Sequence, residues 1–90
     1  METKRYAVVL SEAGAAEVSP FAGIWMRQSN GVSYFNCKSI EPNAAYFRMV
    51  LEESLPDGKT FDFELQIPHA FVRGVLYAAD LKHVGFITAP

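Results

Sequence analysis

The sequence predicts one domain, residues 1–90, of the α+β class: an antiparallel sheet of about six strands with a single helix near residues 69–80. Three observations lead to this prediction. Two turn motifs, each flanked by runs of strand-forming residues, predict two β-hairpins, and the apolar residues after Pro68 recur at helical spacing. Ninety residues, of which 50% are apolar, are enough for one hydrophobic core. The alternative fold is a small all-β barrel of the SH3-like kind.

The first predicted elements are a strand, a loop and a hairpin. Residues 5–10 are apolar and β-branched, which is typical of a strand, and the small and acidic residues of 11–20 indicate a loop. Asn30-Gly31 then suits a two-residue type I′ turn, because both central residues of that turn adopt positive φ. The turn would join strands over 21–28 and 32–40.

This turn fixes which residues of the hairpin face each other. The expected cross-strand pairs are Ser29 with Val32, Arg27 with Tyr34, Met26 with Phe35, and Trp25 with Asn36. One face then carries the expected core residues Ala22, Ile24, Met26, Phe35 and Cys37. The outward face carries large, hydrogen-bonding or basic side chains and no acid: Trp25, Arg27, Tyr34, Asn36 and Lys38.

The middle of the chain fits either a helix over 42–54, beginning at Pro42, or one strand of a second hairpin. The hairpin is favoured, because a three-residue loop within 55–59, with Gly58 in the left-handed conformation, gives a consistent register. The expected pairs are Phe47 with Ile67, Arg48 with Gln66, Met49 with Leu65, Val50 with Glu64, Leu51 with Phe63, and Glu53 with Phe61. One unfavourable pair results, Glu52 opposite Asp62.

The segment 69–80 follows Pro68, a residue that suits the first position of a helix, and its apolar residues have helical spacing. Gly74 counts against a helix, since glycine costs about 1 kcal/mol there relative to alanine. A strand is the alternative for this segment. That strand would turn inward Val72, Gly74, Leu76 and Ala78. A last strand is expected over 84–88.

Composition argues against several classes of protein. Eight basic and ten acidic side chains leave a net charge of −2, which disfavours binding to nucleic acid or to an anionic membrane through a basic patch. No apolar stretch reaches the roughly 20 residues of a membrane span or the roughly 7–15 of a secretory signal. The single cysteine fits a reducing compartment, so a cytoplasmic protein is expected. Scattered glycines, one cysteine and two histidines predict no cofactor and no metal site within one chain.

Two groups of residues are candidate binding sites. The first is the outward face of the first hairpin, because tryptophan, tyrosine and arginine concentrate binding energy at interfaces. If the sheet is covered on both faces, however, Trp25 is simply part of the core. The second group is a polar stripe, which requires that 69–80 is a helix. It comprises His69, Arg73, Tyr77 and Asp80.

The leading functional prediction is a non-enzymatic binding domain that forms a homodimer, burying either the outward hairpin face or an unpaired sheet edge. The second is a small-ligand-binding protein or enzyme with a cleft at the polar stripe, where His69 is the best single catalytic candidate. The third is a single-stranded nucleic-acid binder, which the acidic total disfavours. No catalytic residue is assigned, and Cys37 is expected to be a buried hydrophobe rather than a nucleophile.

Overall fold

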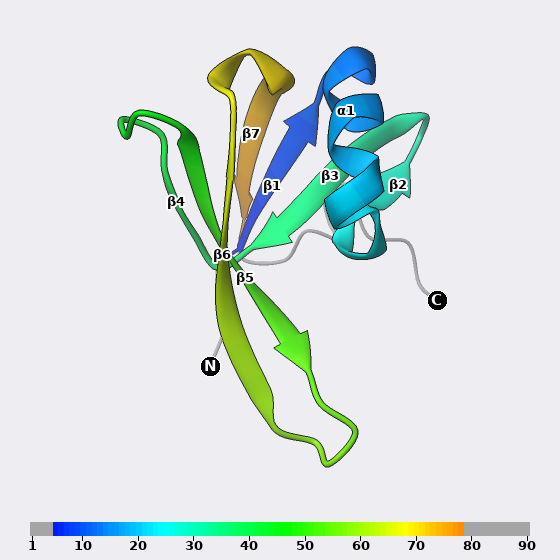
Figure 1. The fold of residues 1–90 in the computed structure, drawn as a ribbon, viewed down its shortest axis with the longest axis vertical. Helices are drawn as coiled ribbons and strands as arrows, with labels where there is room; N and C mark the ends of the chain where they lie inside the picture. Colours follow the sequence, from blue (N-terminus) through cyan, green and yellow to red (C-terminus); the bar gives the residue numbers. More distant parts are fainter. Residues whose placement is uncertain (1–4, 79–90) are drawn as a thin grey trace.

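The computed structural model describes residues 5–78, and their fold is α+β, as predicted (Figure 1). The elements in order are β1 (Arg5–Leu10), α1 (Glu12–Ala22), the 3₁₀ turn η1 (Gly23–Trp25), β2 (Arg27–Ser29), β3 (Val32–Cys37), β4 (Ser39–Glu41), β5 (Phe47–Ser54), β6 (Thr60–Ile67), the 3₁₀ turn η2 (His69–Phe71) and β7 (Val72–Ala78). The described strands form two antiparallel sheets rather than the one predicted. The four-stranded sheet has the order β2-β3-β1-β7 and the three-stranded sheet the order β4-β5-β6, and within these residues neither closes into a barrel.

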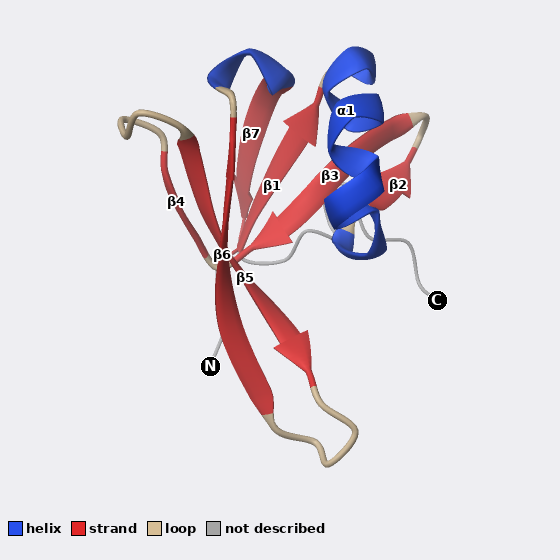
Figure 2. Cartoon of the chain, viewed as in Figure 1, coloured by secondary structure: helices blue, strands red, loops and turns tan. Residues whose placement is uncertain are grey.

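Helix α1 occupies the segment 11–20 that was predicted as a loop, so that prediction is wrong (Figure 2). Ser11 caps the helix, since its hydroxyl accepts a hydrogen bond from the Gly14 N–H at 3.0 Å. Pro20 lies inside the helix and removes one backbone donor. The helix forms nevertheless, because its inner face, including the fully buried Val18, packs on the core.

The predicted helix near 69–80 is also wrong, because its described part is η2 followed by strand β7. The alternative prediction of a strand is confirmed for these residues. β7 pairs with β1, with Val75 opposite Val8, and this pairing satisfies backbone groups along a second side of β1. Asp80 and the predicted strand over 84–88 lie outside the described residues.

A β-bulge decides which residues of β7 face the core. The register of β1 and β7 shifts between Val9 and Leu10, which leaves Arg73 as an extra residue. Directly paired residues lie on the same face of a sheet, so Val75 lies on the core side and Leu76 on the other side. The expectation that Leu76 points inward is therefore wrong.

The first predicted hairpin forms, but it is shorter than predicted. Asn30 and Gly31 have φ of 53° and 82°, as the type I′ turn requires, and Arg27 pairs with Tyr34 as expected. β2 begins only at Arg27, because the preceding residues form η1 rather than an extended strand beside β3. The expectation that Ile24 is a core residue is wrong, since its side chain is 84% exposed.

The second predicted hairpin is confirmed together with its register, and the alternative of a helix over 42–54 is excluded. Every predicted cross-strand pair occurs between β5 and β6. Gly58 has a φ of 89°, and the Leu55 N–H donates to the Lys59 carbonyl at 2.7 Å, which closes the loop. The tip of this long hairpin projects away from the rest of the fold (Figure 1).

The predicted strand over 32–40 is divided between the two sheets at Lys38. β3 belongs to the four-stranded sheet and β4 to the three-stranded sheet. Between them, the Lys38 N–H donates to the Val50 carbonyl at 2.8 Å. One continuous segment therefore joins the two sheets.

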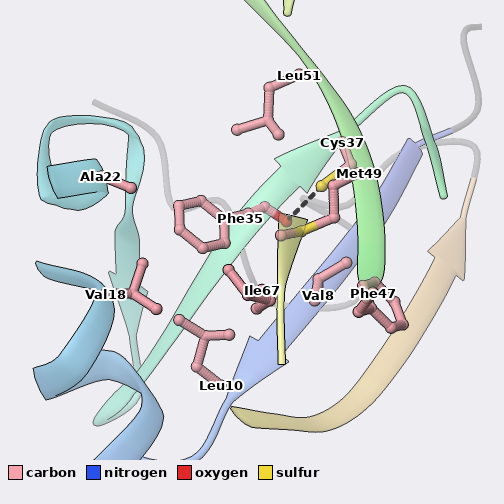
Figure 3. Packing of buried hydrophobic residues seen from close by; sticks show 10 residues of the cluster. All are labelled: Val8, Leu10, Val18, Ala22, Phe35, Cys37, Phe47, Met49, Leu51 and Ile67. Carbon is pink, nitrogen blue, oxygen red and sulfur yellow. Dashed lines mark hydrogen bonds between the residues drawn. The ribbon is translucent and has the colours of Figure 1, made fainter. Parts of the chain in front are cut away.

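The hydrophobic core lies between the two sheets and α1 (Figure 3). The Cys37 thiol is buried there and donates to the Phe35 carbonyl at 3.6 Å, so the prediction of a buried cysteine is confirmed. The buried cluster comprises Val8, Leu10, Val18, Ala22, Phe35, Cys37, Phe47, Met49, Leu51 and Ile67.

Candidate functional site

A cleft of about 440 Å³ lies beside the point where β2 begins, between the four-stranded sheet and the end of β5. The chain runs through η1 before it joins the sheet at Arg27, so the end of β3 has no described strand beside it on this side. The residues that line the cleft are Arg5, Ile24, Trp25, Met26, Arg27, Asn36, Leu51, Glu52, Glu53 and Ser54.

Trp25 links η1 to the long hairpin at this cleft. Its indole N–H donates to Glu53 Oε2 at 2.6 Å, and its ring packs on Phe63 with the ring centroids 4.6 Å apart. The side chain is partly buried and still lines the cleft. Trp25 therefore lies on a turn, and the prediction that placed it on a strand opposite Asn36 is wrong.

Ion pairs beside the cleft explain the unfavourable pair of the second hairpin. Arg5 Nη2 lies 3.0 Å from Glu52 Oε1. Lys38 Nζ lies 3.8 Å from Glu52 Oε2 and 3.0 Å from Asp62 Oδ2. The hydrogen bond from Arg5, together with the positive charges of Arg5 and Lys38, lowers the pKa of Glu52. The two cations thus allow Glu52 and Asp62 to face each other.

Two polar side chains at the cleft are left unused by the described fold. Arg27 is exposed and forms no ion pair within residues 5–78. Asn36 Oδ1 is buried and has no hydrogen-bond partner among these residues, an arrangement that costs about 1–3 kcal/mol.

The main chain of Asn36 also faces the cleft. In an antiparallel ladder, the residues whose N–H and C=O point to one neighbour alternate along the strand. Val32 closes the two-residue turn, so the residues of β3 that point towards β2 are Val32, Tyr34 and then Asn36. The peptide groups of Asn36 therefore point into the space where β2 does not extend.

Tyr34 does not reach the cleft, because its side chain is only 1% exposed. Burial raises the pKa of its hydroxyl, and the charge of Arg27 opposes this with a smaller effect. Phe35, on the opposite face of the same strand, is fully buried as well. The four-stranded sheet thus has buried side chains on both faces, and the predicted open face of aromatic and basic residues does not form.

The cleft nevertheless brings together three of the five residues predicted for that face, namely Trp25, Arg27 and Asn36. Lys38 is not among the lining residues and forms ion pairs with Glu52 and Asp62 of the long hairpin. Sequence reasoning missed Arg5, Glu52 and Glu53. The like-charged pair of Glu52 and Asp62 was a signal for Glu52 and for a nearby cation such as Arg5, and the sequence held no such signal for Glu53.

The alternative site at the polar stripe is not assembled. The Nε2 atom of His69 lies 2.8 Å from the Ala44 carbonyl oxygen, whereas the ring of Tyr77 packs on Tyr6 with the centroids 4.5 Å apart. Arg73 is the bulged residue of β7, and four residues of a strand span about 13 Å, so Arg73 and Tyr77 do not converge. Asp80 lies outside the described residues.

Within residues 5–78, no group of three or more histidine, cysteine, aspartate or glutamate side chains is placed to hold a metal ion. In the same part of the chain, no helix has the length and apolar character to cross a membrane. Compared with protein-family models, with curated proteins and with solved structures, the chain gives no match.

Proposed function

We propose that the chain is a non-enzymatic binding domain and that its cleft binds an extended, carboxylate-bearing segment of another polypeptide. The observation that carries the proposal is one cleft that holds the exposed Arg27 guanidinium beside Asn36, whose main chain has no described strand next to it and whose buried Oδ1 has no described partner. Folded proteins leave few buried polar atoms without a partner, and each exception calls for an explanation. Because Asn36 lines the cleft, a turn of its side chain would bring this oxygen to a ligand that supplies the missing donor.

An extended segment is favoured by the open edge of β3. The N–H and C=O of Asn36 point into the space beside it, and a strand-like peptide there would continue the ladder that ends at Tyr34. The backbone N–H groups of such a peptide are also donors of the kind that Asn36 Oδ1 lacks. A compact ligand without peptide groups would use fewer of these features.

A carboxylate is favoured by the charges of the cleft. Glu52 is paired with Arg5, and Glu53 accepts the indole N–H of Trp25. Of the two arginines that line the cleft, Arg5 is paired with Glu52, and Arg27 forms no ion pair within the described chain. A guanidinium binds a carboxylate through two parallel hydrogen bonds, so an acidic side chain is the natural partner of Arg27.

The non-enzymatic part of the proposal is supported by the two candidate reactive groups. Burial raises the pKa of the Cys37 thiol to about 12, which keeps it protonated and unreactive at neutral pH. His69 is not among the residues that line the cleft. The cleft therefore offers binding groups without an activated nucleophile beside them.

The fluorescence of Trp25 tests the proposal, because this is the single tryptophan of the chain and it lines the cleft. The probe is the capped peptide acetyl-Ala-Glu-Ala-amide, and acetyl-Ala-Gln-Ala-amide is its neutral counterpart. We expect the Trp25 fluorescence to change saturably as the glutamate peptide is added, with a Kd of about 1 mM for so short a probe. The glutamine peptide should bind about tenfold more weakly, because the charge-assisted hydrogen bonds are lost.

Two variants show whether Arg27 is responsible. Arg27→Gln should reduce the affinity for the glutamate peptide to that for the glutamine peptide. Lys59→Gln removes an exposed lysine at the hairpin loop, outside the cleft, and should leave the affinity unchanged. The proposal would be contradicted if the two peptides bind equally well, or if Arg27→Gln and Lys59→Gln lose the same affinity for the glutamate peptide. The absence of a saturable fluorescence change would also contradict it.

A further inference from the structure

The outer edge of β7 is the least protected strand edge in the described part of the chain. β7 has seven residues with one charged side chain, Arg73, and no described strand pairs with its outer side. Val75, Leu76 and Tyr77 are 38%, 40% and 55% exposed, so apolar side chains reach solvent on both faces of this strand. An exposed apolar edge of this length is a template for pairing with another strand.

The other three sheet edges have the protection that native sheets use. β2 and β4 have only three residues each, which is too short to guide the pairing of another chain. β6 has eight residues, but Asp62 and Glu64 place two negative charges along it. The contrast singles out β7 as an edge that is built to be covered.

We propose that β7 pairs antiparallel with β7 of a second copy of this chain, about a two-fold axis at Val75, so that the protein is a homodimer. In this register, Leu76 lies opposite the partner's Gly74. A hollow of about 330 Å³ opens over Gly74, lined also by Val9 and Val32. Among the described residues other than its two chain neighbours, no atom lies within 4 Å of the place where a Gly74 Cβ would be. Each leucine thus has an open space to fill on the other copy.

The charge of β7 also favours a second copy as the occupant. In the same register, Arg73 lies opposite the partner's Tyr77, an aromatic ring that attracts a cation, and no like charges face each other. A two-fold interface uses the leucine and the hollow of both copies at once. This inference depends on β7 alone and is independent of the cleft proposed above.

The solution mass tests the inference, measured by light scattering behind gel filtration. We expect the wild type to have a mass near twice 10.0 kDa, and Leu76→Lys to have a mass near 10.0 kDa. The matched control is Leu55→Lys, because Leu55 and Leu76 are both 40% exposed and only Leu76 belongs to β7. This control should remain a dimer, and circular dichroism should show that all three proteins are folded.

A cysteine variant keeps the test decisive if Leu76→Lys fails to fold. Cys37 is fully buried, so in Val75→Cys the introduced thiol is the accessible one within the described residues. Mild oxidation should link two copies of Val75→Cys through a disulfide, and should link Leu55→Cys far more slowly. The inference would be overturned if the wild type is a monomer, or if Leu76→Lys is folded and still a dimer. Equal rates of cross-linking in the two cysteine variants would overturn it as well.

Discussion

Gly14 is the residue at which α1 meets the segment that leads into β7. A Cβ at this position would lie 2.7 Å from the Phe71 Cβ, which is closer than two non-bonded carbon atoms approach each other. Beside this contact, the Ser11 N–H donates to the Phe71 carbonyl at 2.9 Å. The absence of a side chain at Gly14 therefore allows the beginning of the helix to lie directly on η2. In the sequence, the same small residue contributed to the prediction of a loop over 11–20.

Gly14→Ala should therefore lower the free energy of unfolding, by about 1–3 kcal/mol for an overpacked contact. The sign is informative, because alanine is otherwise favoured in a helix by about 1 kcal/mol. At the exposed Ala16 of the same helix, the preference should be the ordinary one, so Ala16→Gly should also destabilise the protein by about 1 kcal/mol. Urea unfolding measures both. If Gly14→Ala is as stable as the wild type or more so, the close contact with Phe71 is wrong.

Cys37 should make the stability of the fold depend on pH in the alkaline range. Burial raises its pKa from 9.0 to about 12. Between these values the unfolded chain has released the thiol proton while the folded chain keeps it, so stability falls as the pH rises above about 9. In this range we expect the free energy of unfolding of the wild type to fall by up to about 1.4 kcal/mol per pH unit more than that of Cys37→Ala. Urea unfolding as a function of pH gives both slopes, and parallel slopes would contradict a buried, protonated thiol.

The β5–β6 hairpin could be predicted with its register because all that determines it is local. The turn at Gly58 and the alternation of apolar residues in two adjacent segments lead to the same pairing, and a slip by one residue would exchange the faces. The turn at Asn30-Gly31 was predictable for the same reason.

Contacts between distant segments decide the elements that were predicted wrongly. The short apolar run of β7 fits the spacing of a helix and of a strand, and its pairing with β1 determines that it is a strand. In α1, Gly14 and Pro20 oppose a helix locally, and the burial of Val18 in the core outweighs them. Neither contact can be read from its own segment.

Lys38, between β3 and β4, should stabilise the neighbouring hairpin by separating two negative charges. In Lys38→Gln, Glu52 and Asp62 face each other with less compensation, so the free energy of unfolding should fall, and the loss should shrink at high salt. Asp62→Asn in the same background should recover most of it. The control Lys59→Gln removes a lysine that forms no ion pair among residues 5–78. Urea unfolding of the four proteins of the double-mutant cycle gives the coupling, and additive effects would contradict the bridge.

Over residues 5–78 the molecule consists of two sheets joined through Lys38, with a helix over part of the four-stranded sheet (Figure 1). A cleft lies where β2 begins, at Arg27. Residue type and the expected register of the first hairpin predicted a binding face, of which the cleft brings together Trp25, Arg27 and Asn36. The cleft itself could not be predicted, because it exists only between elements whose relative placement depends on the core. The same limit explains why Tyr34 was expected at the surface and is buried.

The central claim is that this cleft is the binding site, and an NMR titration tests it most directly. Nitrogen–proton correlation spectra of the wild-type chain would be recorded with increasing acetyl-Ala-Glu-Ala-amide. We predict that the largest saturable shifts fall on the indole N–H of Trp25, the side chain of Arg27 and the side-chain amide of Asn36, while the resonances of β7 stay unchanged. Shifts centred on β7, or no saturable shifts at millimolar peptide, would contradict the claim.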